Sequence, residues 1–437
     1  MEKNQILEIL SDWNFWAREI DAGIRRDEYV GILAELLTKT DQVVALAGVR
    51  RSGKSTLIRQ TAKELGGGLN TLIVNFEDER FLVRDLQLLS DIFDAYREKV
   101  KPKGKPFMFL DEVQNIPGWE RFVRGVHERK EANIMVTGSS SKLLSAELAT
   151  LLTGRHITYP VYPLSFKEFL FFRKIPVRGD LEALAKRLEI KGLLSEYMEY
   201  GGFPGVVLSS EKQRILLSYF EALINRDVID RYKIREKEKL LVLAKYYLTN
   251  ISSLASYNKT AKFLKLSPTT VERFTNQLEN ANIIFQIKKF DYSVKEQENS
   301  PRKIYSIDTG LSNAMGFRFT EKPGKNMENI VALELKRRQA VKPETEIYYW
   351  KDSQQRETDY VIKEGTKIKE LIQVCYSVED PETKERETKA LLKSMDEFKK
   401  DQATIITLDH EGTEEIKNKK ITYTPLWKWL LTTPDQS

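Results

Sequence analysis

The sequence predicts an α/β fold whose first part is a parallel sheet with helices on both faces. Short apolar runs of strand type alternate there with segments of helical composition, and this alternation is typical of parallel sheets. A glycine-rich loop follows the first run, and such sheets bind their ligands beyond the carboxyl ends of the strands. The five expected strands lie near residues 43–47, 71–76, 107–110, 133–138 and 156–162.

The glycine-rich loop at residues 48–55 reads Gly-Val-Arg-Arg-Ser-Gly-Lys-Ser. It matches the G-x-x-x-x-G-K-S pattern of a phosphate-binding loop, the Walker A motif. Glycine lets successive N–H groups turn toward phosphate oxygens, and the helix after the loop adds its unpaired N–H groups. We expect Lys54 to reach the β- and γ-phosphates of ATP and Ser55 to hold Mg²⁺. The residues expected to bind the nucleotide are Gly48, Arg51, Ser52, Gly53, Lys54, Ser55 and Thr56.

A second motif, about sixty residues further on, is four apolar residues followed by Asp111 and Glu112. This is the Walker B pattern, and its pairing with the phosphate-binding loop makes it specific. Asp111 is expected to hold Mg²⁺ through the water shell of the ion, because Mg²⁺ keeps most of its waters. Glu112 is expected to orient or deprotonate the attacking water as a general base.

Two more residues are candidates for contact with the γ-phosphate. Ser139 follows the expected strand 133–138 and is expected to sense the phosphate, or else the serines 139–141 only cap the next helix. Arg155 is expected to stabilise phosphate charge, either in its own chain or in a neighbouring copy. The alternative for Arg155 is a structural ion pair.

Length and composition exclude several classes of protein. With 437 residues the chain is expected to form two or three domains. It has no run of about 20 apolar residues, so no membrane span is expected. A single cysteine, Cys375, excludes internal disulfides and favours the cytoplasm. A net charge of +6 permits nucleic-acid binding without requiring it.

With both motifs present, the chain resembles the archaeal and bacterial AAA+-type ATPases that carry a DUF4143-like or archaeal-ATPase module at the C-terminus. The resemblance also rests on the segments Thr-Gly-Ser-Ser at 137–140, Gly-Arg at 154–155, Pro-Leu-Ser-Phe at 163–166 and Gly-Gly-Phe-Pro at 201–204. It implies an ATPase core, with Arg155 as a nucleotide-sensing residue. It also implies a helical lid around residues 181–231.

Residues from about 236 to 312 suggest a winged helix. Expected helices at 240–248 and 258–264 precede a third helix that begins Ser-Pro-Thr-Thr, with Ser267 as its N-cap. Strands at 283–290 and 303–307 would form the wing. The third helix would present Thr269, Thr270, Glu272, Arg273 and Asn276 to a DNA groove, with lysines nearby for phosphates. The alternative is a winged helix used only for protein packing.

The last segment has the element order of the restriction-endonuclease-like fold. By that resemblance Glu328 on a helix and Asp359 on a strand match two metal-binding acids. The third motif reads Gln373-Val374-Cys375 and lacks both the carboxylate and the lysine of active members. Glu370 lies three residues before Gln373, so the two side chains point to opposite faces of a strand. We therefore expect a degenerate domain without nuclease activity.

Together these features predict an AAA+-like ATPase that binds ATP with Mg²⁺, hydrolyses it, and couples hydrolysis to duplex or branched DNA. The alternatives are a nucleotide-controlled switch that acts on a protein partner without DNA, and a disfavoured ATP-gated nuclease. Assembly into a homo-oligomer is left open. The expected parts are an ATPase core at 1–175, a helical lid at 176–235, a winged helix at 236–320 and a degenerate restriction-endonuclease-like domain at 321–437.

Overall fold

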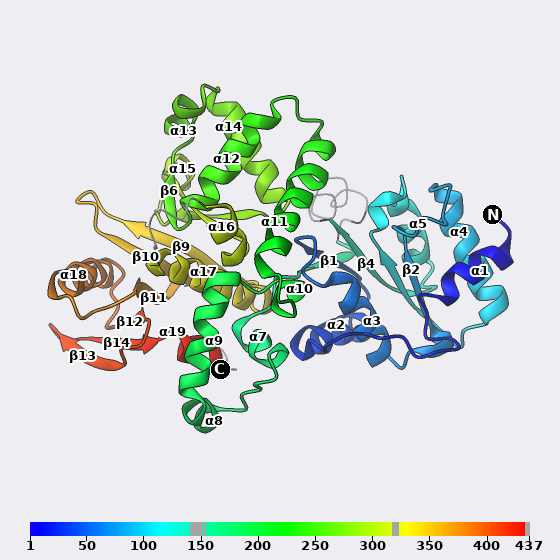
Figure 1. The fold of residues 1–437 in the computed structure, drawn as a ribbon, viewed down its shortest axis with the longest axis horizontal. Coiled ribbons are helices and arrows are strands. Elements are labelled where there is room, and N and C mark those ends of the chain that lie inside the picture. The colour runs from blue at the N-terminus through cyan, green and yellow to red at the C-terminus, as the bar shows by residue number, and fades with distance from the viewer. Residues whose placement is uncertain (140–151, 153, 317–322, 433–437) are drawn as a thin grey trace. The chain divides into compact units, whose positions relative to one another are not determined.

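The computed structural model describes residues 1–139, 152, 154–316 and 323–432 (Figure 1). The chain forms two compact units, Met1–Tyr162 and Pro163–Ser437. Among the described residues, no helix combines the length and the apolar character that crossing a bilayer requires.

The first unit contains a five-stranded sheet in the order β2-β3-β4-β1-β5. Every neighbouring pair of these strands is parallel, which confirms the predicted sheet. The phosphate-binding loop therefore follows the carboxyl end of a central strand, as it must if several strands are to contribute to one site. The strands are β1 (Val43–Gly48), β2 (Thr71–Asn75), β3 (Phe107–Asp111), β4 (Asn133–Ser139) and β5 (His156–Pro160).

Helices cover both faces of this sheet, because its central strands are apolar on both sides. Val43 and Ala45 face the core made with α1 (Lys3–Ser11), α4 (Leu86–Ala95) and α5 (Trp119–Glu128). Val44 and Leu46 face the opposite core, made with α2 (Asp27–Lys39) and α3 (Lys54–Glu64). The alternation follows from the two-residue period of a strand.

The second unit begins with helices. The predicted capping box is present: Ser165 Oγ accepts the Glu168 N–H at 3.2 Å, and Glu168 Oε2 accepts the Ser165 N–H at 2.9 Å. The helices that follow are α7 (Phe166–Phe172), α8 (Asp180–Ala185), α9 (Arg187–Tyr200), α10 (Pro204–Val207) and α11 (Lys212–Ala222), the last continued by a π-helical segment, Leu223–Asp230.

The Gly-Gly-Phe-Pro segment at 201–204 has a structural explanation. Asp308 caps the N-terminus of α16 (Thr309–Met315), and its Oδ2 accepts the Gly202 N–H at 2.7 Å. A Cβ on Gly201 would lie 2.0 Å from Asp308 Oδ1, and Gly201 has a φ of +74°. Only glycine fits both this approach and this backbone conformation.

The three helices predicted around residues 240–280 are present as α12 (Lys237–Thr249), α13 (Tyr257–Leu264) and α14 (Pro268–Asn280). Ser267 caps α14 as expected, since its hydroxyl accepts the Thr270 N–H at 3.1 Å. Two strands, β7 (Ile284–Lys289) and β8 (Arg302–Ser306), form the expected antiparallel pair, with α15 (Val294–Asn299) between them.

This hairpin is not a free wing. β7 also pairs in parallel with β9, with Lys288 opposite Tyr348 and Lys289 opposite Tyr349. The described residues of the second unit thus share one nine-stranded sheet in the order β13-β14-β12-β11-β10-β9-β7-β8-β6. Its other strands are β6 (Ser253–Ala255), β9 (Thr345–Lys351), β10 (Glu357–Glu364), β11 (Lys367–Cys375), β12 (Gln402–Thr407), β13 (Gly412–Ile416) and β14 (Lys419–Pro425).

Helices cover both faces of this sheet as well. Ile372 and Ile406 lie in the core shared with α17 (Pro323–Val341) and α19 (Leu426–Leu431). Val361 and Leu371 lie in the core on the other face, which α18 (Pro381–Glu397) covers with Leu391 and Met395. The acidic residues that resemble a nuclease motif lie on α17, which carries Glu328, and on β10, which carries Asp359.

Candidate nucleotide-binding site

The phosphate-binding loop has the backbone that its glycines predict. Gly53 precedes α3 with a φ of +100°, and Arg51 is also left-handed with a φ of +71°. Lys54, Ser55 and Thr56 form the first turn of α3, whose unpaired N–H groups give the helix start a partial positive charge. The Lys54 ammonium donates to the carbonyl oxygens of Gly48 at 2.9 Å and Val49 at 3.3 Å.

Gly48 is required for a reason that the sequence does not reveal. A Cβ there would lie 2.1 Å from the carbonyl oxygen of Val161, in the segment that follows β5. The Val161 N–H donates to the Ala47 carbonyl at 2.6 Å, which holds the two backbones together. Gly48 therefore allows a neighbouring strand to approach the start of the loop.

A buried arginine braces the loop, and nothing in its local sequence indicated this role. Arg26 lies just before α2, is 2% exposed, and stacks its guanidinium over the ring of Tyr29 at 4.3 Å. Its Nη1 donates to the Ser52 carbonyl at 2.9 Å, and its Nη2 donates to the Tyr162 carbonyl at 3.1 Å. The Ser52 hydroxyl is buried and lacks a hydrogen-bond partner among the described residues, so it is available to a ligand.

The Asp111 carboxyl at the end of β3 lies beside the start of α3. The hydroxyls of Thr137 and Ser55 both hydrogen-bond to it. Burial raises the pKa of Asp111, while these hydroxyls and the Lys54 ammonium act in the opposite direction. The structure thus brings together Ser55 and Asp111, the two residues expected to hold Mg²⁺. Their hydroxyl and carboxylate oxygens are the ligand types that Mg²⁺ prefers.

Thr137 on β4 was missed by sequence reasoning, which selected Ser139 instead. Its Oγ1 accepts the backbone N–H of Glu112 at 3.1 Å and donates to Asp111 Oδ1. One hydroxyl therefore fixes the carboxyl of Asp111 and the backbone of Glu112. The signal that could have found it is a polar residue within an apolar strand next to β3.

Glu112 follows β3 in a left-handed conformation, with a φ of +53°. Its side chain is buried, and Gln114 Nε2 donates to its Oε2 at 2.5 Å. Burial raises the pKa of Glu112, and Lys54 acts to lower it. A buried carboxylate with a raised pKa has the properties of a general base.

Ser139 and Arg155 are the two remaining candidates, and the structure describes the side chain of Arg155 but not that of Ser139. Ser139 ends β4 with its backbone opposite Gly48, but its side chain and residues 140 and 141 lie outside the described part of the chain. Its sensing role stays a prediction.

Arg155 lies at the amino ends of the parallel strands, whereas the phosphate-binding loop lies at their carboxyl ends. Its carbonyl accepts the Val43 N–H at 2.9 Å, at the amino end of β1, whereas the loop follows the carboxyl end of that strand. Its guanidinium pairs with Glu128 at 3.3 Å. The expectation that Arg155 reaches a phosphate in its own chain is therefore wrong, because parallel pairing of β5 with β1 places it a strand length away.

The nuclease-like acids of the second unit surround a lysine. The Lys303 ammonium, from β8, lies 2.9 Å from Glu328, 2.6 Å from Glu357 and 2.8 Å from Asp359. The Lys303 side chain is 2% exposed. Burial acts to lower the pKa of Lys303, but the three carboxylates raise it well above its ordinary value. In the described residues, no group of three or more acids, histidines or cysteines is arranged to hold a metal ion.

Gln373 belongs to the same cluster. Its Oε1 accepts the Asp359 N–H at 3.2 Å, and its Nε2 donates to Glu387 Oε2 at 2.7 Å. Glu370 instead contacts Thr404, as its opposite position in the strand predicted. Sequence reasoning missed Lys303 and Glu387. It could have found Glu357, which shares a strand face with Asp359 two residues away.

Comparisons with known proteins agree with this architecture. A family model described as an AAA domain matches residues 40–170, and two domains of unknown function, DUF8612 and DUF4143, match residues 191–322 and 323–429. The chain is 35% identical over 406 residues to an uncharacterized protein of Methanocaldococcus jannaschii, covering 90% of this chain and 89% of that protein. It is 32% identical over 424 residues to an uncharacterized protein of Haemophilus influenzae, covering 93% and 98%.

Among solved structures, a Walker-type ATPase of Pyrococcus abyssi has 14% sequence identity and a TM-score of 0.44, and the match covers 69% of this chain and 99% of that one. The matches to the two relatives extend over both units of the chain, from the phosphate-binding loop to the C-terminal sheet. The chain belongs to the archaeal and bacterial family of AAA+-type ATPases that carry a DUF4143 domain at the C-terminus.

Proposed function

We propose that this protein binds ATP with Mg²⁺ at the phosphate-binding loop of its first unit, hydrolyses it, and couples hydrolysis to DNA through its second unit. The observation that carries the proposal is the convergence of Lys54, Ser55 and Asp111 beside a left-handed glycine loop. The proposed phosphate ligands are the loop N–H groups from Gly48 to Ser55, together with the Lys54 ammonium and the turn through Thr56.

Glu112 is the proposed general base. Thr137 fixes its backbone and Gln114 orients its carboxylate, so its free oxygen has a defined direction. The carboxylate would take the proton of the attacking water as the bond to the γ-phosphate forms. Bound Mg²⁺, held by Ser55 and Asp111, would neutralise charge on the phosphates. Ser139 remains the proposed γ-phosphate sensor.

The proposed DNA contact is the exposed face of α14. Thr269, Glu272, Arg273 and Asn276 are exposed there, while Val271, Phe274 and Leu278 are buried. Lys259, Lys262 and Lys265 are exposed on and after α13 and would contact phosphates of duplex or branched DNA.

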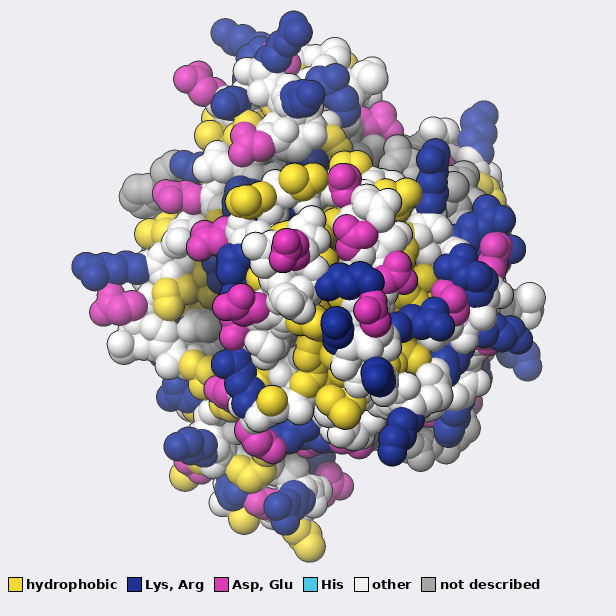
Figure 2. Space-filling model, turned by 90° about the vertical axis from the view of Figure 1, so that its right-hand side faces the viewer, with side chains coloured by type: hydrophobic (Ala, Val, Ile, Leu, Met, Phe, Trp, Pro, Cys, Tyr) yellow, Lys and Arg dark blue, Asp and Glu magenta, His cyan; other side chains and the backbone are white. Residues whose placement is uncertain are grey.

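A nucleotide-controlled switch acting on a protein partner is the second candidate, and two observations favour it. The hairpin expected to act as a wing is tied into the nine-stranded sheet through β9, so it is not free to enter a groove. On the face drawn in Figure 2, lysines and arginines are interspersed with aspartates and glutamates. That face offers no continuous basic surface to DNA.

Arg155 is proposed to act between copies. Its side chain is 40% exposed, and among the described residues it forms an ion pair with the accessible Glu128. A neighbouring copy could receive this guanidinium at its γ-phosphate, as arginines supplied in trans do.

The experiment that tests the proposal compares three proteins for ATP binding by calorimetry and for phosphate release. We expect the wild type to bind ATP with Mg²⁺ and to turn it over. Glu112→Gln should bind ATP with similar affinity and lose turnover by about 100-fold or more. Lys54→Met should lose binding. Adding duplex or branched DNA then separates the two candidates: the DNA-coupled ATPase is stimulated, and the switch is not.

A further inference from the structure

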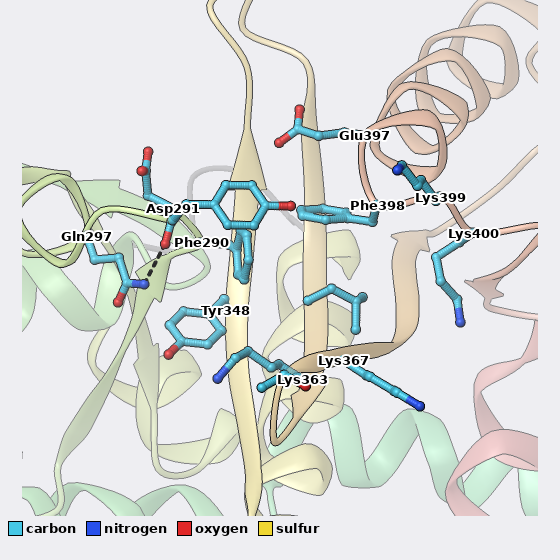
Figure 3. Close-up of a pocket in the computed structure, with 13 residues that line it drawn as sticks. Phe290, Asp291, Gln297, Tyr348, Lys363, Lys367, Glu397, Phe398, Lys399 and Lys400 are labelled. Carbon is cyan, nitrogen blue, oxygen red and sulfur yellow. Dashed lines mark hydrogen bonds between the residues drawn. The ribbon is translucent and has the colours of Figure 1, made fainter.

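The second unit contains a cavity of about 640 Å³ that the proposed function does not use. Figure 3 shows that segments far apart in the sequence line it: the residues after β7, Gln297 of α15, Tyr348 of β9, the β10–β11 turn, and the end of α18 with the residues after it. Its volume is in the range of small-ligand sites. It is open to solvent and is lined by aromatic rings and lysines.

The aromatic side of the cavity is arranged around Phe290. The rings of Tyr292, Tyr348 and Phe398 meet the Phe290 ring edge-on, with centroids 5.2, 5.6 and 5.0 Å away. Phe290 is 7% exposed and anchors the group, whereas Tyr292 is 78% exposed. An exposed tyrosine held against a buried ring offers a planar surface that costs little entropy to order.

The charges around these rings are mainly positive. Lys363, Lys367, Lys399 and Lys400 line the cavity, against two acids. Both acids are already engaged: Glu397 accepts the Trp350 indole N–H at 3.0 Å, and Asp291 accepts the Ser293 N–H at 2.9 Å.

One lysine is also engaged, since Lys363 pairs with Glu346. In the described part of the chain, Lys367, Lys399 and Lys400 have no ion-pair partner within 4.0 Å. The labelled side chains of Lys367 and Lys400 extend on the same side of the cavity in Figure 3. A cavity with two ammonium groups on one side and aromatic rings on the other matches a phosphate joined to a planar ring.

We propose that this cavity binds an unstacked nucleobase together with its phosphate. The base would stack on Tyr292, and Lys367 and Lys400 would bind the phosphate. The source would be a single-stranded segment of nucleic acid or a free mononucleotide, which share this chemistry. The inference rests on the DNA-coupling part of the proposed function and deepens it by adding a site for an unstacked base to the duplex or branched DNA contact proposed on α14.

The test measures binding of a fluorescently labelled 12-nucleotide single-stranded DNA to the full chain by anisotropy, without ATP. Tyr292→Ala should weaken binding by about 5-fold or more, whereas Tyr292→Phe keeps the ring and the affinity. Lys367→Gln and Lys400→Gln should each weaken binding and make it less dependent on salt. Matched controls are Tyr376→Ala and Lys420→Gln, which remove an exposed tyrosine and an exposed lysine that do not line the cavity.

Competition identifies the source of the ligand. Unlabelled single-stranded DNA should displace the probe at lower concentration than thymidine monophosphate if a strand is bound; the reverse order identifies a mononucleotide site. Equal competition by polyglutamate would overturn the proposal, as would equal affinity of Tyr292→Ala and Tyr376→Ala. ATP turnover without nucleic acid is measured on the same variants and should be unchanged. If the cavity does not bind nucleic acid, the cavity variants bind the probe as well as their controls do. If the ATPase site is wrongly assigned, ATP turnover fails to depend on Lys54 and Glu112, whatever the cavity binds.

Discussion

Each unit has buried carboxylates under the influence of a lysine, with opposite consequences. In the first unit the Lys54 ammonium donates to loop carbonyls, and hydroxyls of Thr137 and Ser55 hold Asp111. In the second unit the Lys303 ammonium lies within 2.9 Å of three carboxylates and is almost completely buried. An arrangement of neutral donors leaves a carboxylate its charge for a metal ion, whereas a central ammonium neutralises the charge internally.

This difference explains why similar residue types predict function in one place and structure in the other. Glu328 and Asp359 match a metal-binding pattern, but Lys303 is the cation between them. The nuclease alternative is disfavoured for this reason, beyond the missing third motif. Substitutions of matched residues in the two units can break or sharpen this contrast, and their expected effects decrease from Lys303 through Thr137 to Asp308.

Removing the buried cation should have the largest effect. Lys303→Met keeps the length of the side chain and leaves three carboxylates without their partner, so we expect a loss of about 3–5 kcal/mol in the free energy of unfolding. Urea denaturation measures it. Neutralising two of the three acids in the triple variant Lys303→Met, Glu328→Gln, Asp359→Asn should recover part of the loss. A single variant as stable as the wild type would show that Lys303 does not balance these charges.

The hydroxyl that links the two acids of the first unit comes next. Thr137→Val keeps the shape of the side chain but leaves Asp111 Oδ1 and the Glu112 N–H without their partner, at a cost of about 1–3 kcal/mol. ATP turnover should fall together with the free energy of unfolding, and Thr137→Ser should keep both close to their wild-type values.

Thr358→Val is the matched control in the second unit. That threonine is fully buried and bonds to Ser394 Oγ at 2.9 Å. Loss of this hydrogen bond in Thr358→Val should lower the free energy of unfolding and leave ATP turnover unchanged. Equal effects of the two valine variants on turnover would contradict a positioning role for Thr137.

A third kind of buried carboxylate gives the smallest effect. Burial raises the pKa of Asp308 to about 7, although hydrogen bonds from the backbone N–H groups of Gly202, Leu311 and Gly310 act to lower it. The folded state therefore binds more protons than the unfolded state between about pH 4 and pH 7, and stability falls as the pH rises through that range.

Between pH 6 and pH 7 we expect Asp308 to lower the free energy of unfolding by about 1 kcal/mol. Asp308→Asn should lack this contribution to the slope. Urea denaturation of both proteins at the two pH values measures the difference. Identical slopes would contradict a raised pKa.

What the sequence could predict was local in origin. The loop at residues 48–55, the capping box of Ser165 and Glu168, and the N-cap of Ser267 depend on spacing within one element, and each is present. The parallel sheet followed from the alternation of strands and helices. Patterns of this kind are set by backbone geometry within a few residues.

The contacts that the sequence could not predict depend on pairing between distant segments of the chain. Lys303 reaches Asp359 across 56 positions, and Thr137 reaches Asp111 across 26. Arg155 was misplaced for the same reason, because only the register of β5 on β1 shows which edge it occupies. A single sequence does not state which strands are neighbours, so these contacts could not be predicted from it.

The most direct test of the contrast between the units is the number of Mn²⁺ ions bound with a non-hydrolysable ATP analogue, measured by electron paramagnetic resonance. We expect one ion per chain in the wild type, no bound ion in Asp111→Asn, and one ion in both Asp359→Asn and Glu357→Gln. Retention of the ion in Asp111→Asn, or its loss in both second-unit variants, would contradict the assignment of the two carboxylate clusters.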